Sequence, residues 1–214
     1  MKITITLILL NVLVFLFTVG NLEYYILNYG FSSRNFLSGN YWVILTSIFL
    51  HANFTHLFFN MASLFFIGSS LEKKVKGWKY LLVYFLSGFL GNFGMMIPFL
   101  YGPETVGVGA SGAISGIIGF GTFVCPGNLV VFQSIIPLPF ILVGVLYFLS
   151  TSTNLLVPSQ VAYPVHFLGL LTGFIMGFAS IKKGERKRNI IIFILLLLLV
   201  VLLPYIIEVV KWII

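Results

Sequence analysis

Long apolar runs alternate with short polar segments along almost the whole chain. A helix needs about 20 mostly apolar residues to cross the hydrocarbon core of a bilayer. By that measure the pattern predicts seven membrane-spanning helices, at residues 3–19, 56–71, 78–101, 110–124, 130–149, 164–181 and 189–213. The second and fourth runs are short and rich in small residues, so we expect them to begin below the membrane surface.

Residues 21–50 break this pattern, because they are too polar and too interrupted to form another span. Aromatic residues recur through the segment, and aromatic side chains concentrate at the membrane–water interface. They are Tyr24, Tyr25, Tyr29, Phe31, Phe36, Tyr41 and Trp42. We therefore predict a loop that lies at the interface.

The composition requires a membrane. Of the 214 residues, 59% are hydrophobic and 8% are charged, whereas a soluble domain has about 25% charged residues. We therefore predict an all-α polytopic membrane protein. The first apolar run follows Lys2 as in a secretory signal, but it lacks a cleavage site and is long enough to span, so we interpret it as a retained helix. The single cysteine, Cys125, excludes a disulfide framework.

The net charge of +7 could suggest a nucleic-acid partner, but the basic residues form short clusters between the apolar runs. Such clusters orient membrane proteins, since Lys and Arg concentrate on the cytoplasmic side. One orientation places ten of the twelve basic residues inside: Lys2, Lys73, Lys74, Lys76, Lys79, Lys182, Lys183, Arg186, Lys187 and Arg188. We predict a multi-pass protein of the cell membrane, with a cytoplasmic N-terminus, an extracellular C-terminus and no nucleic-acid partner.

Polar side chains at membrane depth are costly and therefore indicate function. In the predicted orientation, the outer ends of three spans carry them: His56 in the second, Ser111 in the fourth and His166 in the sixth. His51, the remaining one of the three histidines in the chain, lies just before the second span. His56 and Asn60 are four residues apart, so they share one helix face.

Two of these spans also have glycine faces. They are formed by Gly112, Gly116 and Gly119 in the fourth span and by Gly169 and Gly173 in the sixth. Facing glycines let two helix backbones approach closely. The pattern therefore predicts that Ser111 lies within hydrogen-bond reach of His166, at a site wetted from the extracellular side.

This juxtaposition favours acyl transfer. A serine hydroxyl becomes a strong nucleophile when a neighbouring base takes its proton, and a neutral imidazole can do so near neutral pH. The oxyanion that forms needs fixed donors, for which the Asn60 amide, an imidazole N–H of His56 and the backbone N–H of Ser111 are candidates. Each feature alone has a structural explanation, since glycine stripes pack helices and buried histidines can be structural. Their combination favours a Ser111–His166 dyad.

Three short motifs resemble those of the rhomboid intramembrane serine proteases. They are His-x4-His-x3-Asn at His51, His56 and Asn60, GxSG at Gly109 to Gly112, and HxxGxxxG at His166, Gly169 and Gly173. The resemblance covers residues 42–178. It implies that Ser111 is the nucleophile and His166 the base of a serine endopeptidase. It also implies an oxyanion hole formed by Asn60, His56 and Ser111. The residues implied to support the site are His51, Gly109, Gly112, Gly169 and Gly173.

The resemblance also implies an architecture. The family fold is a six-helix bundle with a water-filled cavity that opens outside the cell, so residues 1–181 would form the rhomboid-like catalytic core. Residues 182–214 would add a basic cytoplasmic loop and one further transmembrane helix. The implied partners are the lipid bilayer and single-span membrane proteins, which would be cleaved in or near the transmembrane segment. No cofactor is implied.

Two positions depart from the family pattern. Many members carry Trp-Arg in the first loop, whereas Trp42 is followed here by Val43. Members also often carry an aromatic residue four positions after the nucleophile, where it stacks on the catalytic histidine. Here that position is Ser115. The ring of His166 is therefore expected to be held less firmly, or by another residue.

The sequence leaves alternatives open. A catalytically inactive rhomboid-like protein would bind membrane clients without cutting them. A metalloenzyme or metal transporter could use the three histidines, but His51 and His56 are five residues apart and no carboxylate is near, so we predict no metal. A channel or carrier lacks support, because the first six predicted spans contain no carboxylate and no broken repeat is present. The oligomeric state stays undetermined.

Overall fold

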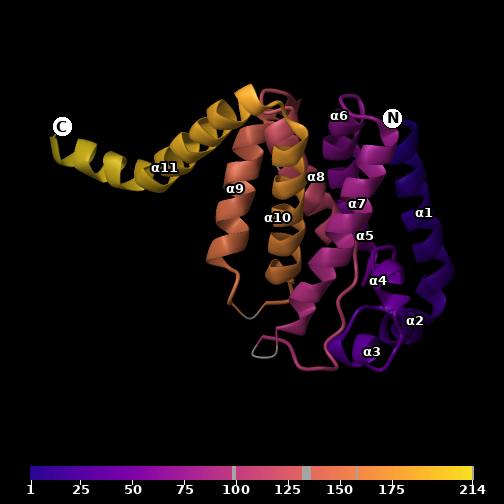
Figure 1. Ribbon diagram of the computed structural model, residues 1–214. Coiled ribbons are helices and arrows are strands. Elements are labelled where there is room, and N and C mark those ends of the chain that lie inside the picture. The colour runs from indigo at the N-terminus through magenta and orange to yellow at the C-terminus, as the bar shows by residue number, and fades with distance from the viewer. Residues whose placement is uncertain (98–99, 132–135, 158, 214) are drawn as a thin grey trace.

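The computed structural model describes residues 1–97, 100–131, 136–157 and 159–213, with side chains described as far as residue 204. Its long helices lie side by side, except for the last one, which extends away from the bundle (Figure 1). They are α1 (Lys2–Thr18), α5 (Phe54–Ser63), α7 (Gly77–Asn92), α8 (Ser111–Val124), α9 (Phe140–Thr153), α10 (Tyr163–Ser180) and α11 (Lys183–Ile213).

Shorter elements extend or connect these helices. They are η1 (Val19–Asn21) and α2 (Leu22–Tyr29) after α1, α3 (Ser33–Leu37), α4 (Val43–Thr46), the π-helix η2 (Leu64–Gly68) and α6 (Ser69–Glu72) after α5, and η3 (Phe93–Met96) after α7. Strands β1 (Leu129–Val130) and β2 (Leu138–Pro139) pair antiparallel, with Leu129 opposite Pro139. The prediction of a helical polytopic membrane protein is confirmed.

Within the described part of the chain, four helical segments are long and apolar enough to cross a membrane. They are Lys2–Tyr29, Phe54–Glu72, Tyr163–Ser180 and Lys183–Pro204. The helices Ser111–Val124 and Phe140–Thr153 are apolar but shorter. The total of seven spans therefore stays a prediction.

Helix α8 is the centre of the bundle. Every residue from Gly112 to Phe123 is buried, and the helix packs mainly against α10 and α7. A Cβ atom added to Gly169 would overlap the backbone oxygen of Gly112, and one added to Gly173 would overlap that of Gly116. The close approach predicted from the glycine faces is thus present, and it is made by backbone against backbone.

At the end of the bundle where the chain starts, α1 is attached to α6 by hydrogen bonds. The carboxylate of Glu72 accepts the N–H groups of Ile3 and Thr4 at 3.0 and 2.9 Å, and the Thr4 hydroxyl at 2.7 Å. These N–H groups belong to the first turn of α1, which has no intrahelical acceptors for them. A negative charge there also interacts favourably with the helix dipole. Glu72 therefore fixes the start of α1.

At the opposite end, residues 21–50 form the short helices α2, α3 and α4 rather than an irregular loop (Figure 1). This segment is tied to the chain that leads into α8. Phe31 and Gly107 exchange two backbone hydrogen bonds, of 2.9 and 2.8 Å, and Arg34 pairs with Glu104 at 2.6 Å. The approach to Ser111 is therefore braced from outside the helix bundle.

Val43, which departs from the family pattern, lies in the interior of this region. It is fully buried in a cluster with Phe31, Met95 and Val165. An apolar side chain at this position contributes to packing, so the segment is anchored here by a small core rather than by an arginine.

The fifth predicted span begins later than expected. Residues 130–149 were predicted as one helix, but α9 starts at Phe140, and residues 129–130 and 138–139 form the β-hairpin. Pro137 and Pro139 explain the difference, because a residue that precedes proline disfavours the helical conformation. Residues 132–135 of this predicted span lie outside the described residues.

Two other boundaries also differ. The basic segment that starts at residue 182 was predicted as a loop, but α11 already begins at Lys183. Lys, Arg and Glu are good helix formers, which allows the helix to extend back through the charged residues. The third span was predicted at residues 78–101, but its helix ends with η3 at Met96. Residues 98–99 lie outside the described residues.

We predict that Gly173→Ala destabilises the fold by about 1–3 kcal/mol, because the new methyl group overlaps the backbone of α8. This cost exceeds the gain of up to ~1 kcal/mol from replacing a helical glycine by alanine. Gly184→Ala is the matched control, since nothing lies within 4 Å of its added Cβ. Thermal unfolding in detergent should show a lower midpoint for Gly173→Ala alone. Equal midpoints would contradict the close packing of α8 and α10.

Candidate active site

Ser111 and His166 are in direct contact. Ser111 is the first residue of α8, and His166 lies in the first turn of α10. The His166 Nε2 atom is 2.8 Å from the Ser111 Oγ atom, across 55 positions of sequence. The contact between Gly112 and Gly169 lies directly beside the pair. The glycine faces thus bring the hydroxyl and the imidazole together, as the sequence pattern predicted.

Helix α5 brings a second group of polar side chains to the same place. Asn53 caps this helix by accepting the His56 N–H at 2.8 Å. A Cβ added at Gly109 would lie 2.7 Å from Cε1 and 2.8 Å from Nε2 of His56, and 3.9 Å from Nδ2 of Asn60. His56 and Asn60 therefore face Gly109, two positions before Ser111. Asn60 is buried and donates one amide hydrogen to the His56 backbone oxygen at 2.9 Å, which leaves its second amide hydrogen to donate elsewhere.

The hydrogen bonds of His56 determine which ring nitrogen carries its proton. The Ala52 N–H donates to His56 Nδ1 at 3.4 Å. In a neutral ring the proton then lies on Nε2, the atom that faces Gly109. His56 and Asn60 can thus each present an N–H group beside the start of α8, which is the arrangement expected of oxyanion donors.

Gly109 holds a conformation that favours glycine. Its φ is +120°, a region that side chains rarely adopt. Its N–H donates to the Ser47 oxygen at 2.9 Å, which links the GxSG segment to the chain after α4. Any side chain here would be strained and would also displace His56, so both properties explain the glycine.

His51 lies in the loop before α5 and is fully buried. Its Nδ1 atom donates to the Phe49 oxygen at 3.3 Å, and its ring lies 5.1 Å from that of His56 in an edge-on arrangement. Burial lowers the pKa of His51 to about 3, and the nearby His56 adds to this effect. His51 is therefore neutral and packs behind His56. Across the described residues, no three His, Cys, Asp or Glu side chains are grouped so that they could hold a metal ion.

Tyr147 is a residue of this site that the sequence did not reveal. Its ring lies on α9 and stacks on His166, with centroids 6.3 Å apart and an interplanar angle of 26°. Ser115 donates to the Ser111 oxygen at 2.7 Å and lies 2.8 Å from the Tyr147 hydroxyl. Since the single hydroxyl hydrogen of Ser115 is used toward Ser111, Tyr147 is the donor to Ser115.

Tyr147 and Ser115 together replace the aromatic residue that the family often carries four positions after the serine. The ring comes from α9, and its hydroxyl is bound to the residue at the vacated position. The signal was present but weak: a tyrosine within the apolar run of α9, and a small residue at position 115 that leaves room for it.

These features define a helical multi-pass membrane protein with a serine–histidine pair between two closely packed helices. A family model, the rhomboid domain, matches residues 38–183. A relative from Bacillus subtilis, YdcA, is named as a rhomboid protease. It is 35% identical over 153 residues, which are 70% of this chain and 72% of that protein. The chain therefore belongs to the rhomboid family.

Other relatives match over shorter parts of their length. RHOMBOID-like protein 2 of Arabidopsis thaliana is 30% identical over 67% of this chain, which spans 44% of the plant protein. Rhomboid protease GluP of Bacillus subtilis is 34% identical over 42% of this chain and 17% of its own length. Both protease and rhomboid-like names thus occur among the relatives.

We predict that Gly109→Ala costs more stability than Gly39→Ala. Both glycines have positive φ, +120° and +92°, so both substitutions introduce backbone strain of about 1–2 kcal/mol. Only at Gly109 does the new methyl group also overlap a neighbour, the His56 ring. Thermal unfolding of the two variants should therefore differ, with Gly109→Ala the less stable. The same loss in both would mean that His56 moves away freely.

Proposed function

We propose that this protein is an intramembrane serine endopeptidase that cleaves single-span membrane proteins in or near their transmembrane segment. The observation that carries the proposal is the 2.8 Å contact between Ser111 Oγ and His166 Nε2. Membership of the rhomboid family supports the class of activity.

The proposed reaction is acyl transfer in two steps. Ser111 Oγ attacks the carbonyl carbon of the scissile bond while His166 Nε2 takes the hydroxyl proton. The C–N bond then breaks, and His166 returns the proton to the leaving amine. A water molecule, activated by His166 in the same way, hydrolyses the acyl-enzyme and restores the serine. No carboxylate orients the imidazole in this scheme, so we assign the positioning of its ring to Tyr147.

The oxyanion hole is proposed to consist of three donors: the Asn60 amide, His56 Nε2–H and the Ser111 backbone N–H. The last of these is an orphan donor of the first turn of α8, where the helix dipole also favours negative charge. The contacts of Gly109 with His56 support the proposal, because they set the α5 side chains against the start of α8.

The membrane topology is part of the proposal. Positive-inside counting favours a cytoplasmic N-terminus. With the seven spans inferred from the apolar runs, the C-terminus would be extracellular and the site would open to the outside of the cell membrane. The 14 residues of α8 rise about 21 Å, which is less than the ~30 Å hydrocarbon core. Ser111 would therefore lie below the outer surface. We assign the catalytic core to residues 1–181 and the attached helix to residues 182–214.

We predict that Ser111→Ala and His166→Ala each lower the rate of cleavage of a single-span substrate in liposomes by about 10⁴-fold or more. Ser180→Ala, an exposed serine at the far end of α10, is the control and should cleave normally.

The same experiment separates the proposal from a catalytically inactive rhomboid-like protein that binds clients. If wild-type protein binds a panel of single-span substrates and cuts none of them, the inactive alternative holds. Cleavage that survives in Ser111→Ala would instead show that another group is the nucleophile.

We predict that Tyr147→Ala lowers kcat about tenfold with little change in KM, because a loosened His166 ring affects the reaction and not substrate binding. Tyr147→Phe keeps the ring and should restore most of the rate. Phe148→Ala is the matched control, since its ring packs on Phe167, Phe174 and Phe193 instead of His166. If Phe148→Ala lowers kcat as much as Tyr147→Ala does, Tyr147 acts only through the packing of α9 and does not position the His166 ring.

A further inference from the structure

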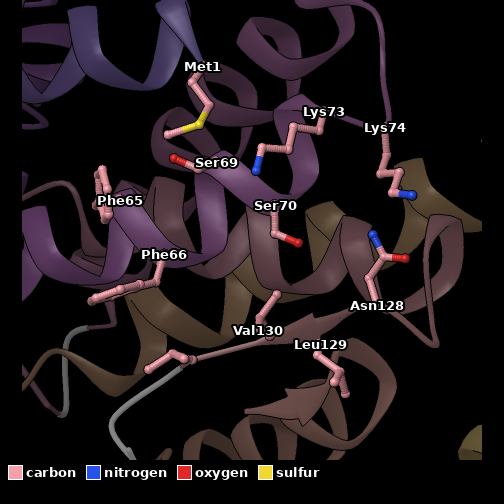
Figure 2. Close-up of a pocket in the computed structure, with 11 residues that line it drawn as sticks. Met1, Phe65, Phe66, Ser69, Ser70, Lys73, Lys74, Asn128, Leu129 and Val130 are labelled. Carbon is pink, nitrogen blue, oxygen red and sulfur yellow. The ribbon is translucent and has the colours of Figure 1, made fainter.

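A pocket with a volume of about 390 Å³ lies at the end of α8 opposite to Ser111. It is formed by the start of α1, by η2 and α6, and by β1 (Figure 2). The 14 residues of α8 separate it from the Ser111–His166 pair by about 20 Å. It is therefore no part of the site described above.

The pocket carries positive charge that the described residues do not neutralise. Lys73 and Lys74 line it, and both are exposed. Among the described residues, no carboxylate lies within salt-bridge distance of either lysine. The adjacent Glu72 does not compensate them, because its two oxygens are bonded to the start of α1. An anion would meet two free ammonium groups here.

A buried hydroxyl in the wall also lacks a partner. Ser69 lines the pocket and is 6% exposed, and its Oγ atom has no hydrogen-bond partner among the described residues. A buried hydroxyl without a partner is unfavourable, but the Oγ atom is itself covered, so Ser69 would have to rotate before it could meet an acceptor oxygen in the pocket. Ser70 adds a second hydroxyl to the lining of the pocket (Figure 2).

The far side of the pocket is apolar. The rings of Phe65 and Phe66 lie at the end away from Lys74 (Figure 2), and they are 39% and 47% exposed. Leu129 of β1 is 63% exposed along the same opening. Polar donors at one end and exposed rings at the other match an amphiphile better than a soluble anion.

We propose that this pocket binds the headgroup of an anionic phospholipid. The phosphate lies between Lys73 and Lys74 and accepts a hydrogen bond from Ser70, and the acyl chains run along Phe65 and Phe66. Basic pockets between membrane helices bind anionic headgroups in this way. In the topology proposed above, the lipid belongs to the cytoplasmic leaflet.

The test is lipid binding to the full-length protein in detergent, measured by native mass spectrometry with phosphatidylglycerol and phosphatidylcholine at equal concentration. Wild-type protein should retain phosphatidylglycerol preferentially. Lys73→Gln/Lys74→Gln should weaken this binding about tenfold. Lys182→Gln/Lys183→Gln removes the same charge at the same end from exposed residues outside the pocket, and should bind as the wild type does.

Two further measurements keep the proposal falsifiable. Ser70→Phe keeps both lysines but fills the pocket, so it should also lose the lipid; binding as in the wild type would overturn the proposal. Glycerol 3-phosphate, which has the phosphate without acyl chains, should fail to displace the lipid at equal concentration, and equal displacement would instead identify a soluble-phosphate site. Equal loss in both lysine pairs would mean non-specific attraction. None of these readouts depends on proteolysis.

Discussion

The approach of α8 to α10 is the constraint on which the site depends. Glycines on both helices put backbone against backbone, and this approach lets the hydroxyl of Ser111 reach His166. Small residues make such contacts possible in a membrane, where lipid is as apolar as leucine and the hydrophobic effect does not drive helices together. The contact is possible only while no side chain separates the two helices, so residues that take no part in the proposed chemistry determine the geometry of the pair.

Around this pair, other elements supply what two helices cannot. Helix α5 brings His56 and Asn60 against Gly109, and α9 brings Tyr147 over the His166 ring. Residues 21–50 hold the chain that leads into α8, through the backbone hydrogen bonds between Phe31 and Gly107. The proposed active site is therefore assembled from four helices: α8 carries the nucleophile and one oxyanion donor, α10 the base, α5 the other two donors, and α9 the support for the ring.

The contact between Ser111 and His166 could be predicted from the sequence because glycine spacing and polar outliers are local signals in an apolar chain. The start of α9 was missed because apolar content alone does not separate a hairpin from a helix, although Pro137 and Pro139 mark the boundary. The helical start of α11 was missed because charge clusters suggest loops. Tyr147 was missed because its sequence signal was weak: its contact with Ser115 joins two helices and depends on how they rotate against each other.

A seam made of glycine backbone has no rotamers to exchange. Its two helices can move only as one rigid unit, because any sliding would separate the carbonyl groups of α8 from the glycines that accommodate them. Adaptation to the substrates proposed above would then come from the surrounding elements, while the backbone spacing of α8 and α10 stays constant. The protein thus keeps its degrees of freedom away from the two atoms whose separation matters most.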